Sequence, residues 1–207
     1  MIFFAMRDTI RGLDPWGSTS RGGRVARVRD ACSRFQGGIV LAIVVLFGGF
    51  VLGLAVHRPR PSAGVGSTPF SFTSPDVMTL ATHNLVVTAV LVAGALTLGA
   101  VTLSALFYNG FLLGTVAKSL LWSGLSPTQV VLLVAPHGVF ELPGLLIAGG
   151  IGLKFAANGW RYLLERRQQP IEERELRDGT LALTVAVLCI LTAAPVELHL
   201  TPQLVSL

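Results

Sequence analysis

Charged residues are scarce in this 207-residue chain, at 13% of the sequence against about 25% in ordinary soluble domains. Hydrophobic residues make up 52%, and the mean hydropathy is +0.67. This composition excludes an ordinary soluble domain and predicts an integral membrane protein. Basic residues outnumber acidic ones, 16 against 11, but the arginines stand in blocks beside apolar segments. That pattern favours membrane topology over nucleic-acid binding.

Cysteine is nearly absent too. The two cysteines, Cys32 and Cys189, lie in a basic leader and inside a late apolar segment, so we expect no disulfide between them. Neither has metal-ligand spacing. A glycine-rich nucleotide loop, a Ser/His/Asp pattern and a reactive-cysteine setting are also missing. We therefore expect a protein that is not an enzyme and has no cofactor.

Several apolar segments approach the roughly 20 residues that a helix needs to cross a bilayer. They predict an all-α, polytopic membrane helical bundle in a single domain, residues 37–207, with five spans at about 37–56, 85–106, 110–124, 129–154 and 180–195. A turn at 107–110 would separate the second and third spans, and the third is short for a full crossing. A re-entrant hairpin replacing the third and fourth spans is an alternative with the same chain ends.

Basic blocks set the expected orientation. Residues 1–36 form a leader with seven arginines against three aspartates, and the loop at 158–179 carries five more arginines. Since positively charged loops stay in the cytoplasm, we expect a multi-pass protein of the cell membrane. Its amino terminus would be cytoplasmic and its carboxyl terminus outside.

The fourth span is the most unusual segment, because its apolar run is interrupted near the middle. Pro136 removes a backbone donor, Gly138 permits a bend and Pro143 repeats the disruption. We therefore predict a helix broken at Pro136–Gly138. His137 and Glu141 lie in the same stretch, and a carboxylate at membrane depth marks a candidate functional site. The alternative is a proline-kinked helix whose Glu141 bonds a neighbouring helix.

Three more polar residues belong to the candidate intramembrane site, which comprises His137, Glu141, Lys118, Asn84 and Asn109. Lys118 and Glu141 fall near the middle of adjacent predicted spans, so they could form an ion pair. Lys118 could instead extend along its stem to an interface. For Asn84 and Asn109 we favour a structural role. His137 and Glu141 are spaced i, i+4, but a zinc site needs three or four ligands, and we predict no metal.

Two further patterns favour structural interpretations. Glycines recur at close-packing spacing at 94–99, 110–114 and 149–152, which favours packing between helices. Residues 172–177, EERELR, match the Glu-Glu-x-x-x-Arg pattern of CAAX-type intramembrane proteases. They lie in a hydrophilic loop without the downstream intramembrane histidines of that family, so we expect a solvated charged helix there.

The order of motifs resembles a known family. His83-Asn84-Leu85, Asn109-Gly110-x-x-x-Gly114, Pro136-His137-Gly138-x-x-Glu141-x-Pro143 and 147–152, IAGGIG, are similar to the stage II sporulation protein M family, in its wider His-Gly-x-x-Glu branch. The resemblance implies a polytopic membrane protein. Sporulating members of the family act as scaffolds for partner hydrolases, while the wider branch includes organisms that do not sporulate.

Two functions follow as hypotheses. The first is a scaffold or assembly factor for a membrane or cell-envelope complex, with protein partners in the membrane or envelope and the capacity to form a homo-oligomer. The second is a permease-like transport subunit with a polar mid-membrane site around His137 and Glu141, since discontinuous helices are common in transporters. In both cases the lipid bilayer is a partner and nucleic acid is not.

Overall fold

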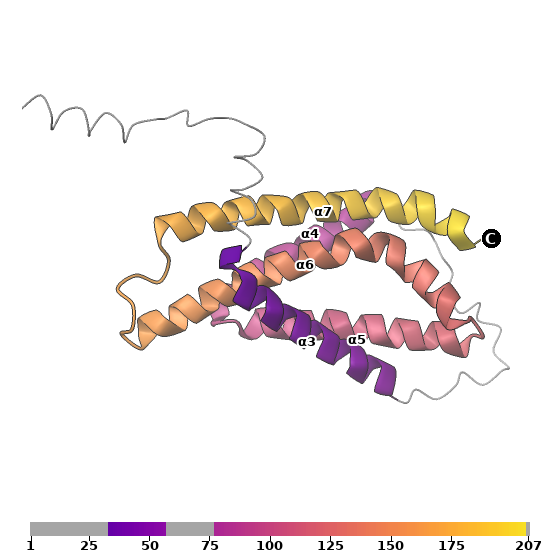
Figure 1. Cartoon of the computed structure of the whole chain (residues 1–207), viewed down its shortest axis with the longest axis horizontal. Coiled ribbons are helices and arrows are strands. Elements are labelled where there is room, and N and C mark those ends of the chain that lie inside the picture. The colour runs from indigo at the N-terminus through magenta and orange to yellow at the C-terminus, as the bar shows by residue number, and fades with distance from the viewer. Residues whose placement is uncertain (1–32, 57–76, 206–207) are drawn as a thin grey trace, which may run out of the picture.

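The computed structural model describes residues 33–56 and 77–205, so most of the predicted leader, including Cys32, lies outside the described residues. Within those ranges the chain is helical with short turns and no strand, which confirms the all-α prediction. The helices are α3 (Gln36–Ala55), α4 (Val77–Ala93), the 3-10 helix η1 (Gly94–Thr97), α5 (Ala100–Trp122), α6 (Pro127–Leu163) and α7 (Glu173–Val205) (Figure 1).

Five of the described helices are long and apolar enough to cross a membrane, which confirms a multi-pass membrane protein. The spans are Gln36–Ala55, Met78–Thr97, Ala100–Trp122, Gly138–Leu163 and Glu173–Ala193. The predicted first span agrees closely with α3. The other bounds are shifted, and the second and third spans need correction.

The turn between the second and third spans is at Leu98–Gly99, directly after η1, and not at 107–110. Leu98 and Gly99 both have left-handed backbone angles, with φ of 52° and 92°, which a continuing helix does not allow. Asn109 and Gly110 are helical residues inside α5 instead. With the turn moved back, α5 has 23 residues, and the third span is no longer short for a crossing.

The predicted break in the fourth span is a bend. The α-helix of α6 is continuous through Pro136 and Gly138, although its shorter N-terminal part turns away from the rest (Figure 1). A proline removes a single helical hydrogen bond and crowds the carbonyl four residues earlier, so bending can relieve it without ending the helix. The start of α6 is well defined, because Ser126 and Gln129 form a reciprocal capping box.

Glycines let α3 and α5 approach backbone to backbone. A side chain added at Gly49 would overlap the carbonyl oxygen of Phe107, and one added at Gly110 would overlap that of Leu46. Gly53 and Gly114 continue the contact one turn further along the helices. The two helices therefore face each other through a pair of Gly-x-x-x-Gly motifs. The packing role predicted for Gly110 and Gly114 is confirmed.

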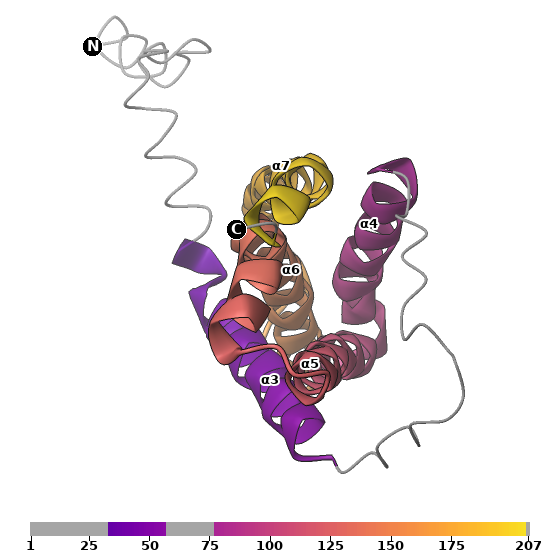
Figure 2. The ribbon, with the colours of Figure 1, turned by 90° about the vertical axis from the view of Figure 1, so that its right-hand side faces the viewer.

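α6 is the central helix of the bundle. It contacts α3, α4, α5 and α7, and Figure 2 shows the other helices arranged around it. Its own glycines make these contacts close: Gly150 lies against Ile39 of α3, and Gly152 against the carbonyl oxygen of Leu91 in α4. The side chain of Thr102 donates a hydrogen bond to that same Leu91 oxygen at 2.8 Å.

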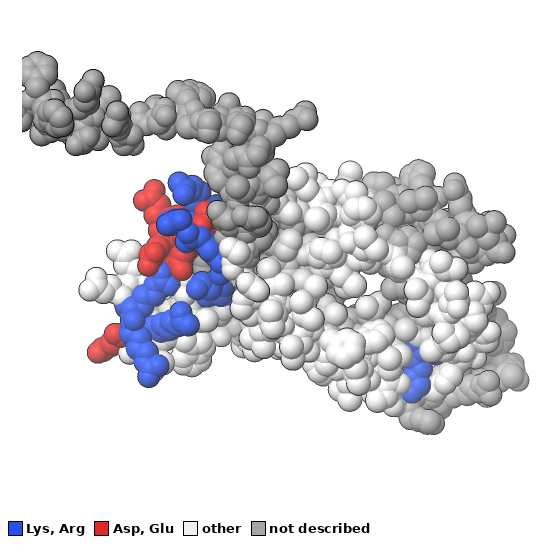
Figure 3. Space-filling model, viewed as in Figure 1, with Lys and Arg blue, Asp and Glu red and all other residues white. Residues whose placement is uncertain are grey.

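Charged side chains gather where α6 ends and α7 begins, which we call the charged end (Figure 3). This end also holds the turn between η1 and α5, because Trp160 Nε1 donates a hydrogen bond to Leu98 O at 3.3 Å. Arg34, just before α3, pairs with Asp178 of α7 at 2.8 Å. The first residues of the bundle are thus tied to its last helix.

Candidate functional site

The structure does not gather the predicted polar residues into one cluster. Asn109 is half-buried and its Nδ2 donates to the carbonyl oxygen of Ala105, one turn earlier in its own helix, at 2.8 Å. The structural role expected for Asn109 stays a prediction. The side chains of Pro136 and His137 lie outside the described residues, so the predicted pairing of His137 with Glu141 stays a prediction.

Asn84 and Glu141 remain candidates for a shared polar region. Asn84 is buried at 6% exposure, and Glu141 is half-buried in α6. α4 and α6 are the second and fourth spans, so they run in the same direction, and Leu91 lies against Gly152. About two turns before this contact, α4 reaches Asn84 and α6 reaches Leu145, so these two residues lie at the same level. Glu141 lies one turn before Leu145 in α6. The two side chains are therefore at similar depth in neighbouring helices.

Lys118 is engaged elsewhere. Its Nζ donates a hydrogen bond to the carbonyl oxygen of Val56 at 2.8 Å and stands 4.9 Å from the ring centroid of Trp122. A cation is favourable at this position, because Val56 caps the negative end of the α3 dipole and the ring adds a cation–π contact. Among the described side chains no ion pair joins Lys118 to Glu141, so the alternative of an extended lysine describes the structure better.

A polar cluster that the sequence did not predict lies at the charged end. Arg167, in the loop after α6, donates two hydrogen bonds to the carboxylate of Glu175 in α7, at 2.7 and 3.2 Å. Asn158 of α6 donates to both oxygens of the same carboxylate, at 3.1 and 3.2 Å. We call Asn158, Arg167 and Glu175 the inter-helix clamp, since they join α6, the loop and α7.

Burial and charge make the clamp a structural element. Asn158 is fully buried, and the side chains of Arg167 and Glu175 are only 16% and 13% exposed. The hydrogen bond to Glu175 raises the pKa of the Arg167 guanidinium above its usual value, while partial burial opposes that shift. Arg167 therefore stays charged and holds the carboxylate in a bidentate contact.

Two neighbours extend the clamp. Arg167 also contacts Glu172 at 2.7 Å, and Lys154 Nζ lies 4.0 Å from Glu175 Oε1. The amide orientation of Asn158 follows from this arrangement, because turning it would place an oxygen against the carboxylate. Its Oδ1 is left buried without a hydrogen-bond donor among the described residues. The expectation of a solvated helix at 172–177 is thus wrong for Glu175.

Sequence reasoning missed the clamp because its members are separated by loop residues. One signal was available: Lys154 and Asn158 are four residues apart, so an ammonium and an amide share one helix face at the end of an apolar run. That pattern indicates a polar partner on a neighbouring helix. It does not identify Glu175 as the partner.

The described part of the chain brings together no group of three His, Cys, Asp or Glu side chains suited to a metal ion. Its polar contacts join helices to one another and to their loops.

Comparison with known proteins agrees with the motifs. A family model described as stage II sporulation protein M matches residues 39–202. An uncharacterized protein from Methanocaldococcus jannaschii is 26% identical over 173 residues, which covers 80% of this chain and 94% of that protein. No solved structure matches the chain. The match to the family model runs from α3 into α7 and covers most of the chain, and on that basis the chain belongs to the stage II sporulation protein M family.

Proposed function

We propose that this protein is a scaffold or assembly factor for a membrane or cell-envelope complex and has no catalytic activity of its own. One observation carries the proposal: the chain uses its ionisable side chains as braces. Arg167 and Glu175 join a loop to α7, Arg34 joins the start of α3 to α7, and Lys118 joins α5 to the end of α3. Groups committed to such contacts are poorly placed to act on a substrate.

Close glycine contacts support the same proposal. Backbones packed through Gly49 and Gly110 or through Gly150 leave little freedom for the helices to slide. A bundle held in one arrangement presents fixed surfaces to other membrane proteins or to a second copy of itself. The exposed Glu173, Arg174 and Arg177 at the charged end carry both signs of charge, which suits recognition of a polar protein surface.

Crosslinking in the native membrane tests the scaffold. A photoreactive residue at position 173 of the full-length chain should yield the same partner protein in repeated preparations. A variant with Arg174→Glu and Arg177→Glu should lose that product while keeping its melting temperature in detergent, because neither arginine has an ion pair among the described residues. Crosslinks to lipid alone, in repeated preparations, would refute the proposal.

We also propose that the amino terminus is cytoplasmic and the carboxyl terminus outside. The support is the asymmetry of charge, since basic side chains crowd the charged end and such loops stay in the cytoplasm. Single cysteines placed at positions 169 and 124, in a Cys32→Ser and Cys189→Ala background, provide the test. An impermeant thiol reagent added to intact cells should label position 124 and spare position 169, and the reverse would invert the topology.

A permease-like subunit is the second candidate function. It is favoured by the bend in α6, with Glu141 half-buried inside the span Gly138–Leu163 and Asn84 at similar depth. Bent helices with polar groups at mid-depth occur in transporters. A proton or solute flux in liposomes that disappears in Glu141→Gln would support this function. Equal leakage from vesicles with the native chain, the variant and no protein would count against it.

A further inference from the structure

The carboxyl end of α6 is closed by a Schellman turn. Arg166 N donates to the carbonyl oxygen of Arg161 at 2.8 Å, and Glu165 N donates to that of Tyr162 at 3.0 Å. Glu165 itself has a left-handed backbone angle, with φ of 56°, as this motif requires. The turn therefore brings the backbones of Arg161 and Arg166 together at the point where α6 leaves the membrane.

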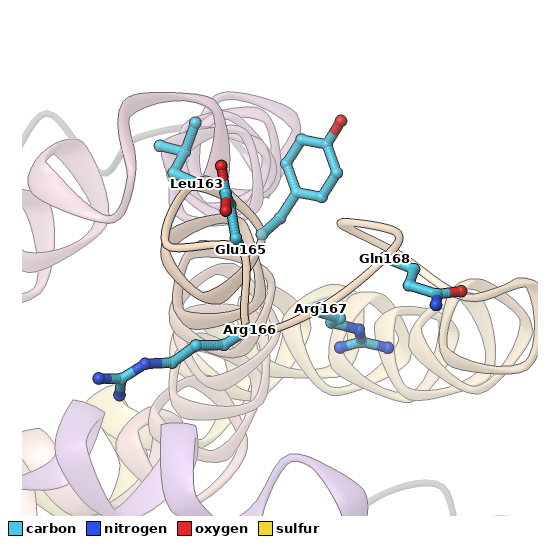
Figure 4. Close-up of a pocket in the computed structure, with 6 residues that line it drawn as sticks. Leu163, Glu165, Arg166, Arg167 and Gln168 are labelled. Atoms are coloured by element: carbon cyan, nitrogen blue, oxygen red, sulfur yellow. The ribbon is translucent and has the colours of Figure 1, made fainter.

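The arginines around this turn differ in what they contact. Arg167 is held by Glu172 and Glu175. Arg161 and Arg166 are exposed, and among the described side chains neither has a carboxylate partner. Figure 4 shows the guanidinium groups of Arg166 and Arg167 leaving the backbone in opposite directions. Two cations at the end of α6 are thus available to an external anion.

Apolar and aromatic side chains lie beside these arginines. Trp160, Leu163 and Leu164 are 51%, 59% and 59% exposed, and the membrane-capable part of α6 ends at Leu163. Tryptophan and tyrosine at the end of a span mark the headgroup level of the bilayer. The hydrogen bond from Trp160 to Leu98 fixes that side of α6 against the neighbouring turn. The two arginines therefore lie at the end of a membrane-capable helix, at the level where lipid headgroups are expected.

A cavity of 510 Å³ opens at the same place, lined by Tyr162, Leu163, Glu165, Arg166, Arg167 and Gln168 (Figure 4). Its polar walls offer guanidinium, amide and phenol donors, while Leu163 offers an apolar wall. Arg166 lines this cavity, whereas Arg161 lies outside the lining, in the last turn of α6. We infer that Arg161 and Arg166 bind the phosphate of an anionic membrane phospholipid, with the lipid chains lying along Leu163 and Leu164. Guanidinium groups match phosphate oxygens in bidentate geometry.

A lipid fits this site better than a soluble phosphate ion. The exposed leucines would otherwise face water at the headgroup level, and a lipid covers them as its phosphate meets the arginines. Glu165 also lines the cavity, and its negative charge weakens the attraction for an anion. We therefore expect that neutralising Glu165 strengthens binding of the same lipid.

Lipid retention measured on the full chain tests the inference. The protein is purified in mild detergent, incubated with phosphatidylglycerol or phosphatidylcholine, and examined by native mass spectrometry. We expect preferential retention of phosphatidylglycerol, reduced on the order of tenfold in the double variant Arg161→Gln, Arg166→Gln and increased in Glu165→Gln. The matched control is Arg174→Gln with Arg177→Gln, which removes the same charge from exposed positions of α7 and should leave retention unchanged.

Other outcomes would overturn the inference. If the α6 double variant and the α7 control lost lipid retention equally, the lipid would be attracted to basic charge in general and not to a local site. Displacement of the lipid by millimolar inorganic phosphate would assign the arginines to a soluble anion. Equal retention of the two lipids by the native chain would remove the charge preference. Melting temperatures of all variants, measured without added lipid, should stay close to the native value, since the substituted side chains make no ion pairs among the described residues.

Discussion

Arg167 Nη2 and Glu175 Oε2 lie 2.7 Å apart, and this contact closes the loop between the last two membrane helices. Asn158 reaches the same carboxylate from α6, so a single acidic side chain is held from two elements at once. The direction of α7 relative to α6 therefore depends on Glu175 as well as on apolar packing. A charged group here serves as part of the fold.

Glu175→Gln should destabilise the bundle by roughly 1–3 kcal/mol, between the values for exposed and buried ion pairs. The amide keeps one acceptor for Asn158 but leaves Arg167 with Glu172 as its carboxylate partner. Unfolding in detergent, followed by loss of helical circular dichroism, measures the change. Arg174→Gln is the control, because Arg174 is exposed, and a loss as large as that of Glu175→Gln would contradict a specific clamp.

Gly49→Ala and Gly48→Ala should act in opposite directions, although the residues are neighbours. A methyl group at Gly49 would overlap the carbonyl oxygen of Phe107, whereas nothing lies within 4 Å of one at Gly48. We expect a loss of about 1–3 kcal/mol for Gly49→Ala from overpacking. Gly48→Ala should gain up to about 1 kcal/mol from helix propensity. Equal thermal stabilities of the two variants would refute the close α3–α5 contact.

Hydropathy predicted the number of crossings but not where each helix ends. Asn109-Gly110 has the local composition of a turn, yet Gly110 packs against Leu46 of another helix, a contact that no local pattern contains. The actual turn uses Leu98 in a left-handed conformation, and leucine gives no turn signal. Pro136 was expected to break the fourth span, yet α6 continues through it and only bends in its N-terminal part (Figure 1). Whether a proline bends or breaks a helix depends on the neighbouring helices, which the local sequence does not specify.

The contacts of the candidate site were likewise not predictable from local sequence. Lys118 and Glu141 were placed together because both lie near the middle of predicted spans, but Lys118 reaches the end of α3. Because α5 begins at Ala100 and ends at Trp122, Lys118 lies about one turn before the end of its helix and not at its middle. The clamp could not be predicted at all, since it depends on how the loop after α6 folds back on α7.

Glu165→Gly should stabilise the protein by roughly 1 kcal/mol, because a left-handed backbone angle costs that much for residues with a side chain. Glu165 has φ of 56° and no ion pair among the described residues. Gly124→Ala is the converse test: it introduces a side chain at φ of 97° with open space around it, so strain alone should lower stability. Both changes can be read from melting temperatures in detergent. A lower melting temperature for Glu165→Gly would contradict the Schellman turn.

Lys118→Met and Glu141→Gln should have additive effects on stability, within about 0.5 kcal/mol. Lys118 contacts Val56 and Trp122, whereas the α6 segment after Glu141 packs through Gly144 against Ala186 and Ile190 of α7. Because the described contacts of Lys118 are with Val56 and Trp122 and none joins it to Glu141, we expect removal of one side chain to leave the contacts of the other unchanged. Unfolding free energies of both single variants and the double variant measure the coupling, and a value above about 1 kcal/mol would place the charges in contact. Lys118→Arg, which keeps a donor for Val56, should lose less stability than Lys118→Met. That difference would show that Lys118 stabilises the protein through its contact with the end of α3.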